Sequence, residues 1–208
     1  MNKKIFPPEI PENVLDRSFE DLIPEEETTG RFAGGRLPGD MRAEKFTECV
    51  FTGCSFADRT LGKCFFDNVA FVGCDASNAT FSDCSFDRVV FEDCKLLGVN
   101  FDGSVFRDVV FKGCNASFAS FYENKFSRAE YEACKMESVT FYRCRQKELY
   151  FSRCAFRQPE FNGTSLKGCD ISDCELAGVS FVGDEFRGCT VSYDQAVTIA
   201  KVFGIKIK

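Results

Sequence analysis

A large apolar residue recurs at nearly every fifth position of this chain from Phe46 to Val191, without a change of phase. Thirty positions share this phase, and nineteen of them are Phe. We call these the central positions. A small position lies two residues before each of them, and the small positions hold all 13 cysteines. An α-helix repeats its buried face about every 3.6 residues and a β-strand about every 2, so the pattern is neither element but an internal repeat.

The cysteines carry a second, longer period. Because they recur at this longer spacing, four units of five residues should make one coil, and the cysteines of the series should form one straight buried column. Large and small central residues each keep to their own face of the coil, which predicts a closely packed core with four sides. Seven cysteines stand 20 residues apart in this unbroken series: Cys54, Cys74, Cys94, Cys114, Cys134, Cys154 and Cys174.

The repeated unit C-x-F-x-x resembles the pentapeptide repeat family, whose consensus is A(D/N)Lxx with Leu or Phe at the centre. The resemblance covers residues 46–191. It implies an all-β fold, a right-handed quadrilateral β-helix with one coil for every four repeats, and the 20-residue cysteine series independently supports this geometry. We therefore predict that the central residues point inward. Burying one Phe contributes about 2 kcal/mol, so such a core would hold the chain without metals or cross-links.

Residues 1–45 lie outside the regular repeat and are predicted to form an N-terminal cap and an irregular first coil, because an open solenoid end invites association. Three prolines among the first 11 residues predict an extended lead-in. Residues 14–22 would present one apolar face as a helix, and a short strand is the alternative. Met41 is out of phase with Leu37 by one residue, so one residue is lost or bulged within residues 30–41.

Two departures within the repeats could be functional. The unit Gln146–Leu149 has a polar central residue and an oversized small residue, and we expect a local bulge with side chains turned to water, with a recognition bump as the alternative. Arg59 occupies a small position near the first coil, where we expect a contact with the cap rather than a ligand site.

The chain changes character after Val191, and we predict a helix over residues 193–203. Ser192 and Gln195 have capping-box spacing, and Gly204 suits the position after a helix. The last four residues, from Ile205 to Lys208, alternate as a short strand would. Residues 192–208 thus form a third segment, a short C-terminal α-helix and tail.

This tail resembles the C-terminal module of the DNA gyrase-binding, quinolone-resistance pentapeptide repeat proteins. Because the repeats are uninterrupted, the chain resembles the loop-free branch of that group. The resemblance implies a two-fold homodimer joined through the tail. An exposed apolar side of the helix beside the last residues would form the partner surface. The dimerisation residues that we expect are Val197, Ala200, Phe203, Ile205 and Ile207.

The sequence gives no indication of catalysis or of a bound cofactor. It contains no His and no glycine-rich phosphate loop. The cysteines could in principle bind a soft metal, but thiolate ligands must converge on one point, whereas a ladder in register holds its side chains parallel. We therefore predict that the cysteines serve packing. Their odd number and buried positions indicate a reducing compartment, the cytoplasm, rather than a disulfide framework.

The net charge of −6 makes direct binding of nucleic acid unlikely as a function. Two protein-binding functions remain. An acidic rod of duplex-like girth could occupy the basic groove of DNA gyrase or topoisomerase IV, as the resemblance implies, and so modulate quinolone susceptibility. Alternatively the chain is a scaffold for another protein, and its acidity only keeps it soluble. For the first function we expect contacts from acidic residues near the dimer centre: Asp170, Asp173, Glu175, Asp184 and Glu185.

Overall fold

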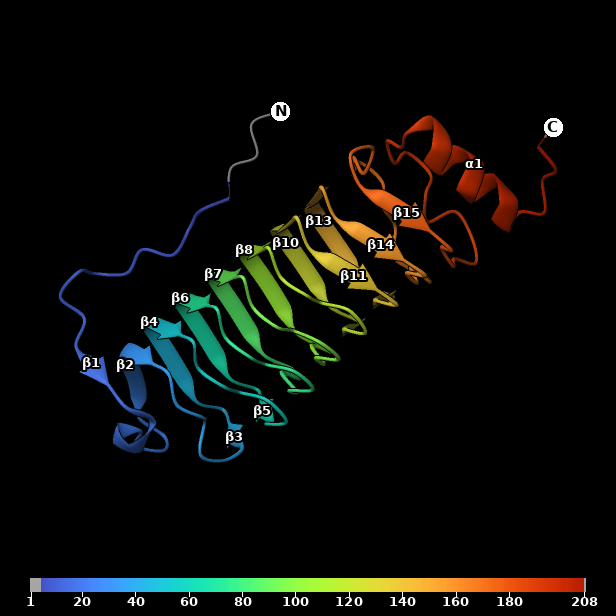
Figure 1. The fold of residues 1–208 in the computed structure, drawn as a ribbon. Helices are drawn as coiled ribbons and strands as arrows, with labels where there is room; N and C mark the ends of the chain where they lie inside the picture. Colours follow the sequence, from blue (N-terminus) through green and yellow to red (C-terminus); the bar gives the residue numbers. More distant parts are fainter. Residues whose placement is uncertain (1–4, 208) are drawn as a thin grey trace.

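The computed structural model describes residues 5–207, which form an elongated solenoid ending in one short helix (Figure 1). The chain makes about eight turns, and the strands of successive turns pair in parallel along the long axis. The predicted fold class is confirmed, because the chain is mostly β, is built from five-residue repeats and carries a C-terminal helix. No helix within residues 5–207 is long and apolar enough to cross a membrane.

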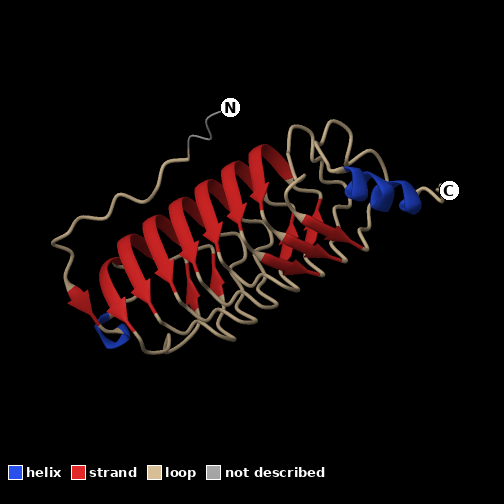
Figure 2. Cartoon of the chain, turned by 45° about the horizontal axis from the view of Figure 1, so that its top comes forward, coloured by secondary structure: helices blue, strands red, loops and turns tan. Residues whose placement is uncertain are grey.

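Most strands belong to one parallel sheet that runs the length of the rod (Figure 2). In spatial order its strands are β1 (Asp16–Arg17), β2 (Glu27–Ala33), β4 (Lys45–Thr52), β6 (Phe65–Val72), β7 (Ser85–Glu92), β8 (Val105–Lys112), β10 (Lys125–Glu132) and β13 (Arg145–Ser152). The shorter strands form three small sheets on the other faces: β11 (Lys135–Glu137), β14 (Ala155–Arg157) and β15 (Glu175–Ala177); β9 (Ser120–Tyr122) and β12 (Thr140–Tyr142); β3 (Met41–Arg42) and β5 (Leu61–Gly62).

The strands of the large sheet bend at a fixed corner. Phe86 of β7 pairs with Phe66 of β6 and with Phe106 of β8, so one coil takes 20 residues, as the cysteine period predicts. Each of the longer strands spans two repeat units and has a left-handed residue between them, such as Arg88 at φ 51° and Asp108 at φ 54°. This conformation turns the chain through the corner while both flanking units stay paired.

The core is a stack of aromatic rings. Every central position from Phe46 to Val191 is buried except Gln146, Phe186 and Val191, and the last two still pack against the core. Along one face, rings from successive coils stack almost parallel, with centroids 4.7 Å apart between Phe71 and Phe91. The prediction of inward-pointing central residues is therefore confirmed in all but the last coils and Gln146.

The predicted cysteine column is buried throughout, and its thiols also form hydrogen bonds. The thiol of Cys74 donates to the carbonyl oxygen of Phe51 at 3.2 Å, and that of Cys134 donates to Phe111 at 3.3 Å. On another face, the hydroxyl of Ser104 makes the equivalent bond to Phe81 at 2.7 Å. A small side chain with a weak donor satisfies the second lone pair of a buried carbonyl, which Ala or Val could not do.

The N-terminal end of the core is covered by one aromatic side chain. Phe19 lies in a 3-10 helix, η1 (Phe19–Asp21), and its ring stacks on Phe32 at 5.3 Å. The expectation of a helix over residues 14–22 is wrong, and the alternative of a short strand is right, because β1 pairs with β2 before η1 begins. Phe32 pairs with Phe51 at a spacing of 19, whereas Met41 pairs with Leu61 at 20, which confirms one missing residue between them.

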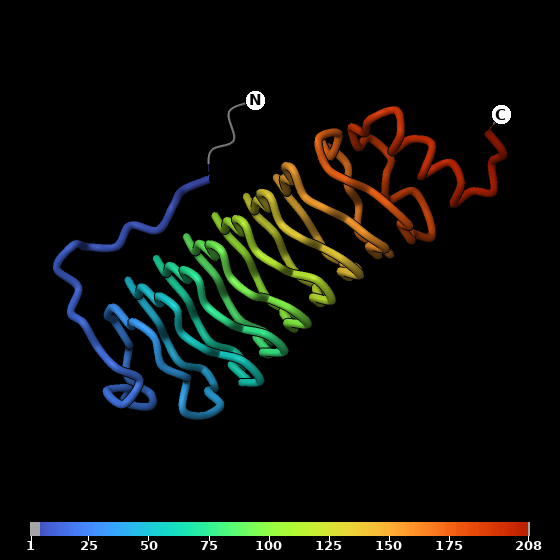
Figure 3. Tube along the Cα trace, viewed as in Figure 1, coloured from blue at the N-terminus to red at the C-terminus, as the bar shows by residue number. Residues whose placement is uncertain are grey.

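Residues 5–13, which we call the N-terminal strap, run back along the rod beside the large sheet (Figure 3). The strap has no helix or strand, as the prolines predict. Arg59 donates from Nε to the carbonyl oxygen of Leu37 at 3.0 Å, so it contacts the first coil as expected.

The bulge expected at Gln146–Leu149 is absent. β13 keeps an unbroken register with β10, in which Phe126 pairs with Gln146 and Ala129 with Leu149. The Gln146 amide donates to the carbonyl oxygens of Ser165 and Lys167, both at 3.1 Å. A polar central residue is tolerated here because its donors reach backbone acceptors in the next coil, so the strand has no reason to leave the ladder.

Candidate protein interface at the C-terminal end

The helix α1 (Tyr193–Val202) begins where the sequence predicts. The Ser192 hydroxyl accepts from the Gln195 amide at 3.3 Å, and the Gln195 side chain accepts from the Ser192 amide at 2.8 Å, which completes a capping box. Asp194 in the first turn and Lys201 in the last turn complement the helix dipole. Gly204 follows with φ 73°, a left-handed conformation that ends the helix.

Gln195 also attaches this helix to the solenoid. Its side-chain amide donates to the carbonyl oxygens of Ile171 at 2.7 Å and Cys174 at 2.6 Å, and only 4% of the residue is exposed. These carbonyls belong to the last coils, where no further coil follows to satisfy them. The sequence analysis found the capping role of Gln195 but missed this second role, whose only signal is a polar residue at the start of an otherwise apolar helix face.

The apolar tail stays largely uncovered in the single chain. Val197 and Ala200 are half-buried, whereas Phe203, Ile205 and Ile207 are 62%, 55% and 48% exposed. The Phe203 ring touches Phe181 edge-on at 5.3 Å, which fixes its position at the end of the rod. Residues 205–207 form no strand, so that part of the expectation is wrong, and Lys208 lies outside the described residues. The dimerisation role of these five residues stays a prediction.

Four of the five predicted partner-binding acids are exposed as expected. Asp170 and Asp173 lie beside Glu148 and Tyr150 in an open hollow of about 650 Å³ next to β13, the last strand of the large sheet. Glu175 forms an ion pair with Arg157 at 3.2 Å. The side chain of Asp184 is 84% exposed. The structure therefore brings Asp170 and Asp173 together at one hollow.

Glu185 does not fit the prediction of an outward acid, and that prediction is wrong. Only 7% of Glu185 is exposed, and its carboxylate accepts from the amides of Gly163 at 2.9 Å and Gly183 at 2.7 Å. Burial acts to raise the pKa of this carboxyl, but the backbone hydrogen bonds outweigh it, and the pKa is lowered. The neighbouring Asp184 stands at a small position, where burying its charge would be costly, so the chain turns Asp184 outward and Glu185 inward.

Farther from this end, outward acids pair with bases one coil away. Asp87 pairs with Arg107 at 2.7 Å, and Glu92 pairs with Lys112 at 2.6 Å. Glu132 pairs with Arg153 of the next coil. Each exposed pair contributes only about 0–1 kcal/mol to stability, but the pairing cancels much of the negative charge in the middle of the rod.

The buried cysteines have raised pKa values where no neighbouring thiol is involved. Burial raises the pKa of Cys144 to about 11 and that of Cys49 to about 12, so both thiols are neutral at physiological pH. Within residues 5–207, no group of three or more potential ligands converges on a point that could hold a metal ion.

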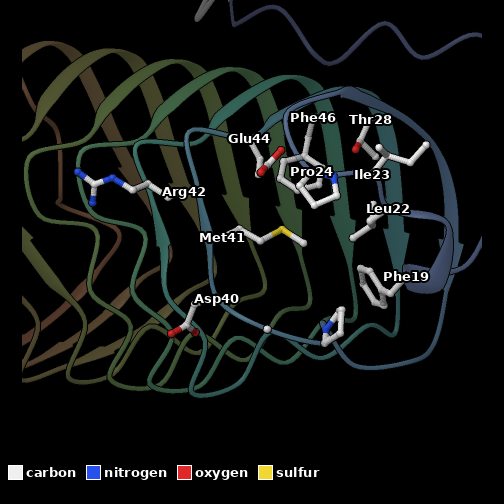
Figure 4. A pocket seen from close by; sticks show the side chains of 12 residues that line it. Phe19, Leu22, Ile23, Pro24, Thr28, Asp40, Met41, Arg42, Glu44 and Phe46 are labelled. Carbon is white, nitrogen blue, oxygen red and sulfur yellow. The ribbon is translucent and has the colours of Figure 1, made fainter.

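A second hollow lies at the opposite end of the rod (Figure 4). It has a volume of about 280 Å³, and Phe19, Leu22, Met41 and Phe46 form its apolar wall. The sequence analysis missed it, although the residue lost between Leu37 and Met41 is the feature that opens the first coil here.

Comparison with known proteins supports the repeat assignment. A profile of the pentapeptide repeat region matches residues 44–121 and 84–154, and a profile of pentapeptide repeats in eight copies matches residues 150–183. No curated protein sequence matches the chain. Among solved structures, a trypsin-treated variant of QnrB1, a plasmid-mediated fluoroquinolone resistance protein, is similar at 20% identity and a TM-score of 0.45, covering 88% of this chain and 99% of that chain. HetL from the cyanobacterium Nostoc sp. strain PCC 7120 is similar at 11% identity and a TM-score of 0.31, covering 77% and 84%.

Proposed function

The chain belongs to the pentapeptide repeat family, and on that basis we propose that it is a non-enzymatic scaffold that binds another protein and acts as a homodimer joined through its tail. The observation that carries this proposal is the placement of exposed apolar residues and exposed carboxylates at one end of the rod. Its free buried thiols fit a reducing cytoplasm.

The dimer would bury the side chains of Phe203, Ile205 and Ile207. Leaving such residues in water forgoes about 25 cal/mol for each Å² of apolar surface that could be covered, and a second copy offers the same surface in return. Val197 and Ala200, which are half-buried on α1, would border the contact. Joining two rods by this end would bring their acidic last coils together at the centre of the assembly.

Dimerisation is tested best in the full chain, because removing the tail would also remove Gln195 and its bonds to the last coils. We expect sedimentation of the unaltered protein at micromolar concentration to show a dimer. The double variant Ile205→Glu and Ile207→Glu should be a folded monomer, since both side chains are exposed. A monomer in the unaltered case would contradict the proposal.

We further propose that the partner is a type II topoisomerase, DNA gyrase or topoisomerase IV, whose basic DNA groove the dimer would occupy as a DNA mimic. The resemblance of the tail to the gyrase-binding module and the exposed acids Asp170, Asp173, Glu175 and Asp184 support this proposal. Because charges in the middle of the rod are paired, the mimicry would be confined to the coils nearest the dimer centre.

The test is a gyrase supercoiling assay with and without ciprofloxacin. We expect the dimer to inhibit supercoiling or relieve quinolone inhibition, and the effect to weaken as salt rises from about 0.05 to about 0.3 M because exposed charges are screened. The double reversal Asp173→Lys and Glu175→Lys should reduce the effect without unfolding the protein. A matched reversal at the paired mid-rod residue Glu92 should change little. No effect at tens of micromolar would leave the alternative, a scaffold for a different protein partner.

A further inference from the structure

The N-terminal strap lies over a column of polar residues at the corner of the large sheet. We call this column the corner ladder and define it as Asn68, Arg88, Asp108 and Arg128, one residue from each of four successive coils. All four have left-handed backbone conformations, which point their side chains outward at the bend. The strap runs along the rod on this side in Figures 1 and 3.

Two backbone amides of the strap donate to the ladder. The Phe6 amide donates to Oδ1 of Asp108 at 3.3 Å, and the Glu9 amide donates to Oδ1 of Asn68 at 3.0 Å. The guanidinium of Arg128 lies 5.7 Å from the centre of the Phe6 ring, within range of a cation–π contact. The strap therefore contacts the ladder at two acceptors that are two coils apart.

The ladder holds its own acceptors in place. Arg128 binds Asp108 with two hydrogen bonds, from Nε at 2.6 Å and from Nη2 at 2.5 Å, and Arg88 donates from Nε to Oδ1 of Asn68 at 2.9 Å. Acceptors and arginines thus alternate along the column. With the strap in place only 3% of Asp108 is exposed, so this carboxylate would carry an exposed, unused acceptor if the strap left.

The spacing of these acceptors matches one particular peptide conformation. Pro7 and Pro8 lie between Phe6 and Glu9, fix their own φ angles and restrict the residues before them to extended backbone. Such a sequence favours the polyproline II helix, which repeats every three residues and rises about 9.3 Å per repeat. Two coils of the rod span about 9.6 Å at the usual strand spacing. A polyproline II segment therefore presents an amide to every second coil, and its prolines cover the arginine between them without needing acceptors.

We propose that the corner ladder is a binding site for a proline-rich peptide in the polyproline II conformation, with an aromatic residue beside Arg128. The strap is this ligand in the closed state, tethered to its own site. A short flexible tether gives an effective concentration in the millimolar range, so the strap can stay bound even if the free peptide binds weakly. A partner with the same type of segment would have to displace it. This site is separate from the C-terminal interface and does not depend on the topoisomerase proposal.

The direct test uses a chain that begins at Val14 and a labelled peptide of residues 5–14, followed by fluorescence anisotropy up to millimolar concentration. No residue of the strap belongs to the buried core, so the shortened chain keeps the complete solenoid. We expect saturable binding to the shortened chain and binding at least about tenfold weaker to the intact chain, where the strap competes. No binding to the shortened chain, or equal binding to both chains, would overturn the proposal.

Backbone methylation separates this site from general stickiness without altering the protein. Methylating the amide nitrogen of Phe6 or Glu9 in the peptide removes one of the two donors, and each change should weaken binding about tenfold. Methylation at Glu12 serves as the control and should leave the affinity unchanged. Equal effects at all three positions would overturn the assignment of the two acceptors.

Variants of the ladder provide the reciprocal test. In the shortened chain, Asp108→Ala with Arg128→Ala should abolish binding of the unmodified peptide. The matched control, Glu92→Ala with Lys112→Ala, removes another ion pair between successive coils and should bind normally. Circular dichroism of both proteins verifies that they are folded, and unchanged binding by the first variant would contradict the proposal.

Discussion

The middle of the rod and its last coil use the same five-residue unit but leave different surfaces. In the middle, Phe101 is completely buried between stacked rings, and an outward acid such as Glu92 is paired with Lys112 of the next coil. In the last coil, Asp184 stays exposed, and Phe203 beyond the helix is 62% exposed although it touches the core. A coil in the middle has a neighbour on each side, whereas the last coil has only one.

The difference teaches where the molecule can interact. Repeats whose polar groups, charges and rings are all satisfied by neighbouring coils offer little to a partner. The last coil satisfies its carbonyls with Gln195 but leaves apolar side chains uncovered, so it is closed to solvent at the backbone and open at the side chains. The predictions below test this contrast, beginning with the largest effect.

The largest effect is expected from Phe101→Ala in the middle of the rod. The ring is fully buried and packs against Phe81 at 5.4 Å and Phe121 at 5.3 Å, so its removal leaves a cavity that the stacked coils cannot close. We expect a loss of about 3–5 kcal/mol in the free energy of unfolding, measured with urea. Phe203→Ala, in a monomeric background, should cost less than about 1 kcal/mol, and equal losses at both sites would remove the contrast.

The second prediction concerns the polar closure of the last coil. Gln195→Ala leaves the carbonyls of Ile171 and Cys174 without their donor and also breaks the capping box. We expect a loss of about 2 kcal/mol and early loss of helical signal on urea unfolding. Thr198→Ala, on the same helix, is the control and should cost far less. If the two variants unfold alike, α1 is not held by Gln195.

The third prediction asks why cysteine fills the small positions. The Cys84 thiol donates to the carbonyl oxygen of Leu61 at 2.9 Å, and Ser104 does the same work in the next coil. If the hydrogen bond matters, Cys84→Ser should be more stable than Cys84→Ala, by about 0.5–1.5 kcal/mol. If the thiol is only a small apolar group, Ala should be the better replacement. Urea unfolding of the two variants under reducing conditions decides between these outcomes.

The regular part of this fold could be predicted from sequence because its period is written into single residues. The register Phe66 to Phe86 to Phe106 follows from the 20-residue spacing, and no other element satisfies that period. Similarly, Ser192, Gln195 and Gly204 predicted both ends of α1, because capping depends on short-range hydrogen bonds.

The rest depended on contacts between residues far apart in sequence. Gln146 seemed out of place by composition, yet its amide finds acceptors in the next coil and the strand continues. The ladder beneath the strap joins Phe6 to Asp108 across a separation of 102 residues, which no local pattern indicates. Glu185 was misassigned because outward direction was inferred from the repeat phase, and the phase is followed less regularly where no further coil fixes it.

The smallest expected effect comes from Glu185, which distinguishes the two regions by pH. Its carboxylate accepts from the amides of Gly163 and Gly183, and its pKa lies below the ordinary value of 4.5. A carboxyl with a lowered pKa in the folded state contributes its full stability above the unfolded pKa and loses it as pH falls through the folded pKa. The difference in unfolding free energy between the unaltered protein and Glu185→Gln should therefore be constant near neutral pH and shrink as pH falls below about 4.5. Urea unfolding across this range measures it, with Glu175→Gln as an exposed control from a neighbouring coil. A difference that does not change with pH would mean that the two amides hold the side chain by shape alone, and Glu185 would then not be a charged anchor of the last coil.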